Sequence, residues 1–105
     1  MKDIAIVYAL FGDRAVAEIA AVQMVDRKLA ACANIQGTCV SVYHWKGEME
    51  RAEETPVLFK TGLDKRMALT AALSAIHDYD LPAISSWTAT TTTDYGQWVE
   101  ETTKE

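Results

Sequence analysis

Residues 41–50 form two extended runs joined by a two-residue break. Side chains of a strand point alternately to opposite faces, so Tyr43 and Trp45 share one face of the first run. Lys46 and Gly47 interrupt the alternation before the second run begins, which predicts a long β-hairpin. Such a hairpin extends beyond the body of a 105-residue chain, and exposed aromatic rings favour docking. We expect the docking partner to be another copy of the same chain.

The N-terminal part of the chain predicts a strand followed by a helix. Residues 4–10 are apolar almost without interruption, as is typical of a central strand. Asp13 is a suitable N-cap, and apolar residues follow it at intervals of three and four. We expect the helix to bury this stripe, which comprises Ala15, Ile19, Val22, Val25 and Leu29.

The middle of the chain predicts the two arms of the hairpin. Residues 31–45 favour extended structure with one bend or bulge near Gly37. Residues 48–61 form the return arm. Pro56 cannot donate to a strand ladder, so we expect an edge or bulge there and an arm of two segments.

The remaining elements complete a recognisable order. Asp64 can cap a second helix, residues 84–90 form a fourth strand, and a short C-terminal helix starts near Asp94. The first six elements match the α+β, ferredoxin-like split β-α-β-β-α-β plan, an antiparallel sheet with a long hairpin between its second and third strands. Both helices then lie on one sheet face, and oligomerisation would cover the other. We expect one domain across residues 1–105.

Composition limits the partners. The net charge of -5 argues against nucleic acid and anionic membranes, which are bound through clustered Lys and Arg. The apolar run near the N-terminus is too short to span a membrane and has no cleavage site of the signal type. Cys32 and Cys39 are too far apart along an extended segment for a disulfide, so we expect two free thiols. These features together predict a cytoplasmic protein.

Four polar features could carry chemistry, and each has a structural alternative. Cys32 could equally be a small core residue, and His77 could be the partner of a helix C-terminus. Lys60 could form an ion pair with the acids of the turn 77–82, and His44 could be an exposed strand residue. The chain contains no Cys-x-x-Cys motif for copper and no glycine-rich phosphate loop.

Five segments closely resemble, in order and at the expected spacing, the motifs of the CutA divalent-cation tolerance proteins. They are LAACANI (29–35), SVYHWKGEME (41–50), FKT (59–61), HDYDLPAI (77–84) and YGQW (95–98). The resemblance implies a ferredoxin-like subunit in a tight, PII-like homotrimer. It also implies association with copper and other divalent cations, and a cytoplasmic location in bacteria.

The resemblance also assigns candidate site residues near a cleft between subunits. A thiolate and an imidazole suit copper. The candidate metal ligands are Cys32, His77 and Asp80. The candidate residues for a small-molecule ligand are Lys60, Tyr79, Trp45 and Trp98. Three positions depart from the family pattern: Asp80 replaces the usual Glu, Ala83 replaces a second Glu, and His44 replaces an aromatic residue.

Two functions remain open from the sequence. The first is a homotrimer, assembled through the hairpin and sheet edges, that binds a divalent metal ion such as copper in the cleft. The second is a PII-like signalling or scaffold module that binds a small anion or metabolite there, in which Lys60 and Tyr79 matter more than Cys32. An enzyme that uses Lys60 or His77 as acid or base is a third, weaker reading, because nothing in the sequence requires turnover. We therefore assign no catalytic residue.

Overall fold

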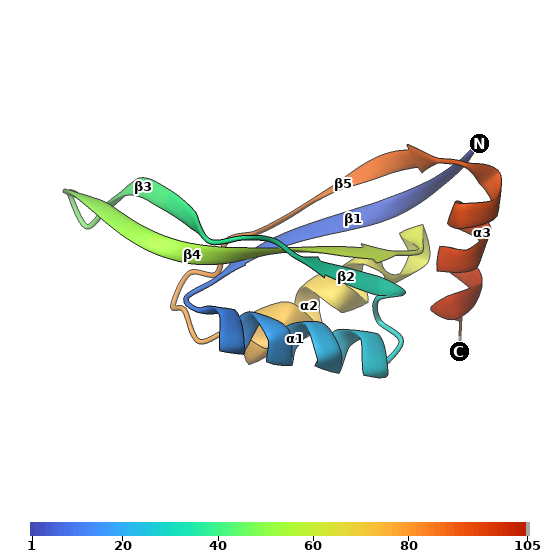
Figure 1. Cartoon of the computed structure of the whole chain (residues 1–105), viewed down its shortest axis with the longest axis horizontal. Coiled ribbons are helices and arrows are strands. Elements are labelled where there is room, and N and C mark those ends of the chain that lie inside the picture. The colour runs from blue at the N-terminus through green and yellow to red at the C-terminus, as the bar shows by residue number, and fades with distance from the viewer. Residues whose placement is uncertain (105) are drawn as a thin grey trace.

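A computed structural model describes residues 1–104 as an antiparallel sheet with two helices on one face and a third helix at one end (Figure 1). The strands are β1 (Lys2–Phe11), β2 (Cys32–Ile35), β3 (Cys39–Trp45), β4 (Glu48–Thr61) and β5 (Ile84–Thr91). The helices are α1 (Arg14–Asp26), α2 (Arg66–Ile76) and α3 (Thr93–Thr102), with a short 3₁₀-helix η1 (Leu63–Lys65) before α2. The strand order β2-β4-β1-β5, with β3 also paired to β4, confirms the predicted α+β ferredoxin-like plan.

The hairpin is formed by β3 and the outer half of β4, and it extends past the helices (Figure 1). Lys46 and Gly47 have φ angles of 52° and 82°, both in the left-handed region. Two such residues between paired strands form a type I′ turn, whose twist matches that of the flanking strands. Trp45 pairs with Glu48 across this turn, which confirms the predicted hairpin.

β4 continues through Pro56 as one strand, so the predicted division of the return arm is wrong. The Pro56 carbonyl accepts a hydrogen bond from the Gln36 N–H at 2.9 Å. The Pro56 nitrogen therefore faces the same side, where residues 36–38 separate β2 from β3. A residue without an N–H is tolerated there because the partner strand is interrupted at that point.

The same interruption places the two free cysteines on one sheet face. Cys32 pairs with Lys60 and Cys39 pairs with Glu54. The positions of the two cysteines differ by an odd number, whereas the positions of their partners on β4 differ by an even number. The break between β2 and β3 thus acts as the bulge expected near Gly37.

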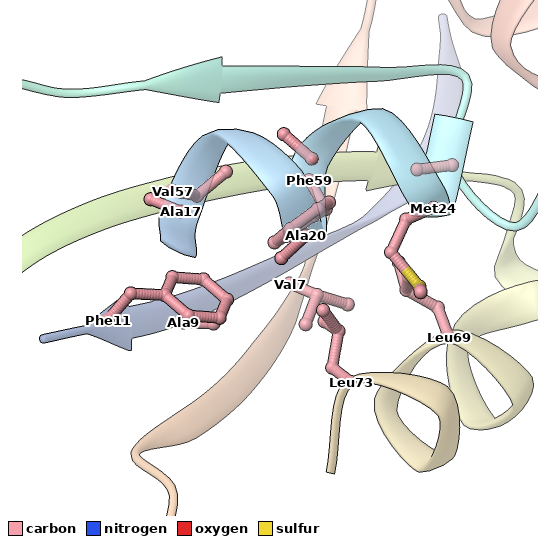
Figure 2. Packing of buried hydrophobic residues seen from close by; sticks show 12 residues of the cluster. Val7, Ala9, Phe11, Ala17, Ala20, Met24, Val57, Phe59, Leu69 and Leu73 are labelled. Atoms are coloured by element: carbon pink, nitrogen blue, oxygen red, sulfur yellow. The ribbon is translucent and has the colours of Figure 1, made fainter. Parts of the chain in front are cut away.

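α1 buries the face opposite to the predicted one. Ala17, Ala20 and Met24 are buried against the sheet (Figure 2), whereas Ile19 is 59% exposed and Val22 is 68% exposed. Small alanine side chains let the helix approach the sheet closely, and large residues from the other elements fill the core. These include Phe11, Val57, Phe59, Leu69 and Leu73.

The two predicted helix caps differ in outcome. Asp13 is the N-cap of α1, and its Oδ1 accepts a hydrogen bond from the Val16 N–H at 2.9 Å. Asp64 lies within η1 and does not cap α2, whose N-cap is Lys65 with no side-chain hydrogen bond. The preceding 3₁₀ turn leads directly into α2 and replaces a side-chain cap.

The sheet face opposite α1 and α2 is covered at one end only. Val99 of α3 packs there with Ile4 of β1. Further along this face Tyr8 and Leu58 are half-buried, and Trp87 is 45% exposed. Within residues 1–104 no helix is long and apolar enough to cross a membrane.

Candidate functional site

A cavity of about 700 Å³ lies between the hairpin and the loop 77–83, which connects α2 to β5. Cys39 pairs with Glu54, so Tyr43 and Trp45, at even steps from Cys39, lie on the same strand face as Glu54. The loop closes the other side. We call this space the hairpin cavity and define it by Tyr43, Trp45, Glu54, Tyr79, Asp80 and Leu81.

A hydrogen bond between Glu54 and Tyr79 joins the two sides of the hairpin cavity. Glu54 is only 7% exposed, and its Oε2 accepts from the Tyr79 hydroxyl at 2.9 Å. Burial raises the pKa of Tyr79 above its ordinary value, and the hydrogen bond to Glu54 raises it further. Tyr79 therefore remains a hydrogen-bond donor to the carboxylate at neutral pH.

His77 fixes the start of the loop. Its side chain is fully buried, and Nε2 donates to the Leu10 carbonyl at 2.6 Å. Nδ1 accepts from the Tyr79 N–H at 3.2 Å, which uses the lone pair of that nitrogen although Asp78 Oδ1 lies 3.5 Å away. Neither ring nitrogen is left to bind a metal ion in this arrangement. His77 thus positions the backbone that carries Tyr79 and Asp80.

A second polar group lies at the other end of the sheet, where α3 packs. We call it the α3-end cluster and define it by Cys32, Lys60, Tyr95 and Trp98. Cys32 Sγ and the Tyr95 hydroxyl are 3.4 Å apart, and Lys60 Nζ lies 5.9 Å from the centroid of the Tyr95 ring. The rings of Tyr95 and Trp98 stack with their centroids 5.9 Å apart. Tyr95, to which the sequence assigned no role, connects the other three.

Tyr95 holds its proton more tightly than an ordinary tyrosine. Burial raises the pKa of Tyr95 to about 12, with further contributions from the hydrogen bond with Cys32 and the charge of that thiol. The hydroxyl is therefore available as a donor to the Cys32 sulfur.

The candidate metal ligands are divided between these two places. Asp80 is exposed and lines the hairpin cavity together with His44 and Ala83, two positions that depart from the family pattern. Cys32 belongs to the α3-end cluster, opposite Lys60 on β4. Residues 54 and 60 of β4 are roughly 20 Å apart at about 3.3 Å per residue. Among the residues described, no group of three or more His, Cys, Asp or Glu side chains is placed to hold a metal ion.

The candidate residues for a small-molecule ligand are divided in the same way. Trp45 and Tyr79 line the hairpin cavity. Lys60 and Trp98 both contact Tyr95 at the opposite end of the sheet. Within one protomer, two of the predicted ligand-binding residues therefore lie at each end of the sheet.

Glu54 is not among the site residues that the sequence predicts. Glu54 lies at an even step from Pro56 and Leu58, so it belongs to the face that carries these less polar residues. Lys60 lies on the same face, whereas the buried core residues Val57 and Phe59 lie on the other. No local pattern therefore singles out Glu54. The pKa of the nearby Tyr8 is raised by burial first and then by the charges of Cys39 and Glu54. Glu54 thus also influences the uncovered sheet face.

The fold and these sites define a class of α+β, ferredoxin-like proteins with a hairpin that extends from the sheet and a cavity at its base. The chain matches the family model described as "CutA1 divalent ion tolerance protein" over residues 5–102. It belongs to that family, and the resemblance seen in the five sequence motifs is confirmed.

Curated relatives agree with this assignment. The divalent-cation tolerance protein CutA of Citrobacter koseri is 33% identical over 88 residues, which are 83% of this chain and 76% of that protein. "Protein CutA, chloroplastic" of Arabidopsis thaliana is 32% identical over 94% of this chain. The chain spans 55% of the Arabidopsis protein and 42% of the CutA homolog of Xenopus laevis.

Solved structures show the same fold. CutA1 from Ehrlichia chaffeensis has a TM-score of 0.93 and 32% identity, covering 100% of this chain and 99% of its own. The periplasmic divalent cation tolerance protein CutA from Archaeoglobus fulgidus has a TM-score of 0.91 and 27% identity, covering 96% of this chain and 99% of its own.

Proposed function

We propose that this chain acts in divalent-cation tolerance as a homotrimer that binds metal ions, copper foremost, in the cleft between subunits. The observation that carries the proposal is the division of the candidate ligands between the two ends of the sheet. In a cyclic assembly each subunit presents one surface patch to a different patch of the next subunit, so the two ends of the sheet can come together between copies. In such a ring Cys32 of one copy meets Asp80 of another.

The uncovered sheet face supports the assembly. Trp87 is 45% exposed on the edge strand β5, and Tyr43 and Trp45 of the hairpin, which continue the same sheet face, are 42% and 38% exposed. Apolar surface of this kind marks protein interfaces. The hairpin and the sheet edges therefore provide the contacts of the proposed trimer.

Cys32 and Asp80 are the proposed ligands, and His77 positions the loop that carries Asp80. A thiolate selects copper over hard cations such as magnesium, which prefer oxygen ligands. Both cysteines are free thiols, which suits the reducing cytoplasm that we propose as the location. The words "chloroplastic" and "periplasmic" belong to the names of the Arabidopsis and Archaeoglobus relatives. Metal binding alone accounts for the proposed role, without catalysis.

Copper titration of the metal-free protein tests the proposal. Light scattering should give the mass of a trimer, and calorimetry should show copper binding that Cys32→Ser and Asp80→Asn each weaken by more than about tenfold. Cys39→Ser and Asp78→Asn are matched controls, because they remove the same groups at positions outside the proposed site. Unchanged affinity in both Cys32→Ser and Asp80→Asn would exclude the site.

A second candidate function rests on Lys60. Its ammonium lies over the Tyr95 ring, and within residues 1–104 no acidic side chain forms an ion pair with it. The positive charge of Lys60 would therefore be available to bind an oxyanion. A PII-like signalling or scaffold module that binds an anion requires such a charge. Native mass spectrometry of protein purified without added ligand distinguishes the two functions by retained metal or retained organic mass.

A further inference from the structure

The formally charged side chains that line the hairpin cavity are acidic, although His44 also lines it and the Lys46 ammonium lies 5.9 Å from the centroid of the Trp45 ring. Glu54 and Asp80 are the formally charged side chains among the described residues that line it, and neither Lys nor Arg lines it. Glu54 is 7% exposed, and a buried carboxylate without a cationic partner costs free energy. A positively charged ligand would compensate this cost.

One oxygen of Glu54 is left for such a ligand. Its Oε2 accepts from the Tyr79 hydroxyl at 2.9 Å, and among the described residues no other hydrogen bond reaches this carboxylate. An ionised carboxylate can accept at both oxygens. Oε1 is therefore the atom at which an ammonium group could donate a hydrogen bond.

Three aromatic side chains provide the rest of the surroundings. Tyr43, Trp45 and Tyr79 line the cavity, and the face of an aromatic ring attracts a cation. The volume of about 700 Å³ falls within the range of small-molecule sites and greatly exceeds that of a single metal ion. Rings and one buried carboxylate suit an organic cation, whereas a metal ion needs several close donor atoms.

We propose that the hairpin cavity binds an aliphatic amine in its ammonium form, with the nitrogen paired to Glu54 and the carbon chain against Tyr43 and Trp45. Asp80, exposed at the same cavity, would attract a second ammonium group on a longer amine. Asp80 would thus be shared with the metal site proposed above, but the pairing of the amine with Glu54 does not depend on metal binding.

Cadaverine is the probe. Its binding to the full chain is measured by calorimetry at low salt, with a chelator present. Pentanediol has the same carbon chain without charge, and glutarate has the same chain with opposite charge. We expect cadaverine to bind while pentanediol and glutarate do not. Failure of cadaverine to bind, or equal binding of pentanediol, would overturn the proposal.

The variants assign the binding to Glu54. Glu54→Gln keeps an acceptor for Tyr79 but removes the charge, and it should weaken cadaverine binding by roughly tenfold or more. Glu53→Gln is the matched control, since it removes the same charge from the exposed neighbour on β4 and should leave affinity within about twofold. Equal losses in both variants would show that only net charge matters and would overturn the proposal.

A second variant keeps the test decisive if Glu54→Gln does not fold. Trp45→Leu changes a side chain that is 38% exposed on the hairpin, so the core is unaffected, and it is compared with the wild type at a concentration where light scattering gives the same oligomeric state for both. It should weaken cadaverine binding by roughly threefold or more through loss of the ring face. Full affinity in Trp45→Leu would overturn the placement of the amine against the hairpin.

Discussion

The imidazole of His77 stacks on the ring of Phe11, with ring centroids 4.8 Å apart and 11° between their planes. Phe11 is the last residue of β1 and belongs to the buried core. The loop that carries Tyr79 and Asp80 is therefore attached to the core through a buried aromatic contact. A residue that the sequence motif presents as a metal ligand is, within one protomer, a structural anchor.

His77→Ala should destabilise the metal-free protein. The substitution removes the ring contact and leaves the Leu10 carbonyl and the Tyr79 N–H without their partners. We expect a loss of about 2–4 kcal/mol in the free energy of unfolding. Denaturant unfolding in the presence of a chelator, at a fixed protomer concentration, measures it. Asp78→Ala, at the exposed neighbouring position, is the control, and wild-type stability of His77→Ala would contradict the structural role.

Tyr79→Phe should lower stability by about 1–3 kcal/mol, because the buried carboxylate of Glu54 loses its donor. Tyr43→Phe is the matched control, since that tyrosine is 42% exposed on the same cavity. A double-mutant cycle with Glu54→Gln should give a coupling energy of roughly 0.5–3 kcal/mol. Additive effects in the cycle would mean that the hydrogen bond contributes nothing.

The raised pKa of Tyr95 makes stability depend on alkaline pH. Burial first, and then the Cys32 thiol, raises this pKa to about 12, whereas an unfolded tyrosine titrates near about 10. Between these values the unfolded chain releases a proton that the folded chain keeps. The contribution is therefore complete below about pH 10 and is lost as the pH rises towards about 12.

Comparison of the wild type with Tyr95→Phe isolates this contribution, because the other alkaline titrations are common to both proteins. The wild type should lose more stability between these pH values than the variant does. Unfolding curves at several pH values, together with the ultraviolet absorbance of tyrosinate, measure the difference. Parallel pH profiles for the two proteins would refute the assignment.

Trp45→Ala should weaken the proposed trimer. The ring is 38% exposed on the hairpin, and aromatic anchors of this kind contribute about 2 kcal/mol or more to an interface. Light scattering over a dilution series should show dissociation at a concentration where the wild type remains assembled. Met67→Ala removes a side chain that is 82% exposed on α2 and serves as the control. Persistence of the trimer at every dilution that preserves the wild type would count against the hairpin as an interface.

Elements marked by local patterns could be predicted from the sequence. The turn at Lys46 and Gly47, the N-cap at Asp13 and the order of strands and helices all follow from neighbouring residues. The buried face of α1 could not be predicted, because this helix has apolar residues on two sides. The larger side chains, such as Ile19, suggested one face, whereas the sheet packs against the other, where Ala17 and Ala20 allow close approach.

The candidate site depends on contacts between distant residues, which the sequence pattern does not contain. Glu54 and Tyr79 are 25 positions apart and meet only because the loop after α2 folds back to the base of the hairpin. The motif series identified Tyr79 and Asp80 by resemblance. It did not reveal that the buried nitrogens of His77 are already hydrogen-bonded.

β4 runs for 14 residues from the tip of the hairpin into the core without a break. Its outer half pairs with β3 and its inner half pairs with β1 and β2, so the projecting arm and the body share one strand. The arm consequently has no hinge of its own. Trp45 pairs with Glu48, the first residue of β4, so the tip of the hairpin, Glu54 of the cavity and Phe59 of the core lie along one continuous strand.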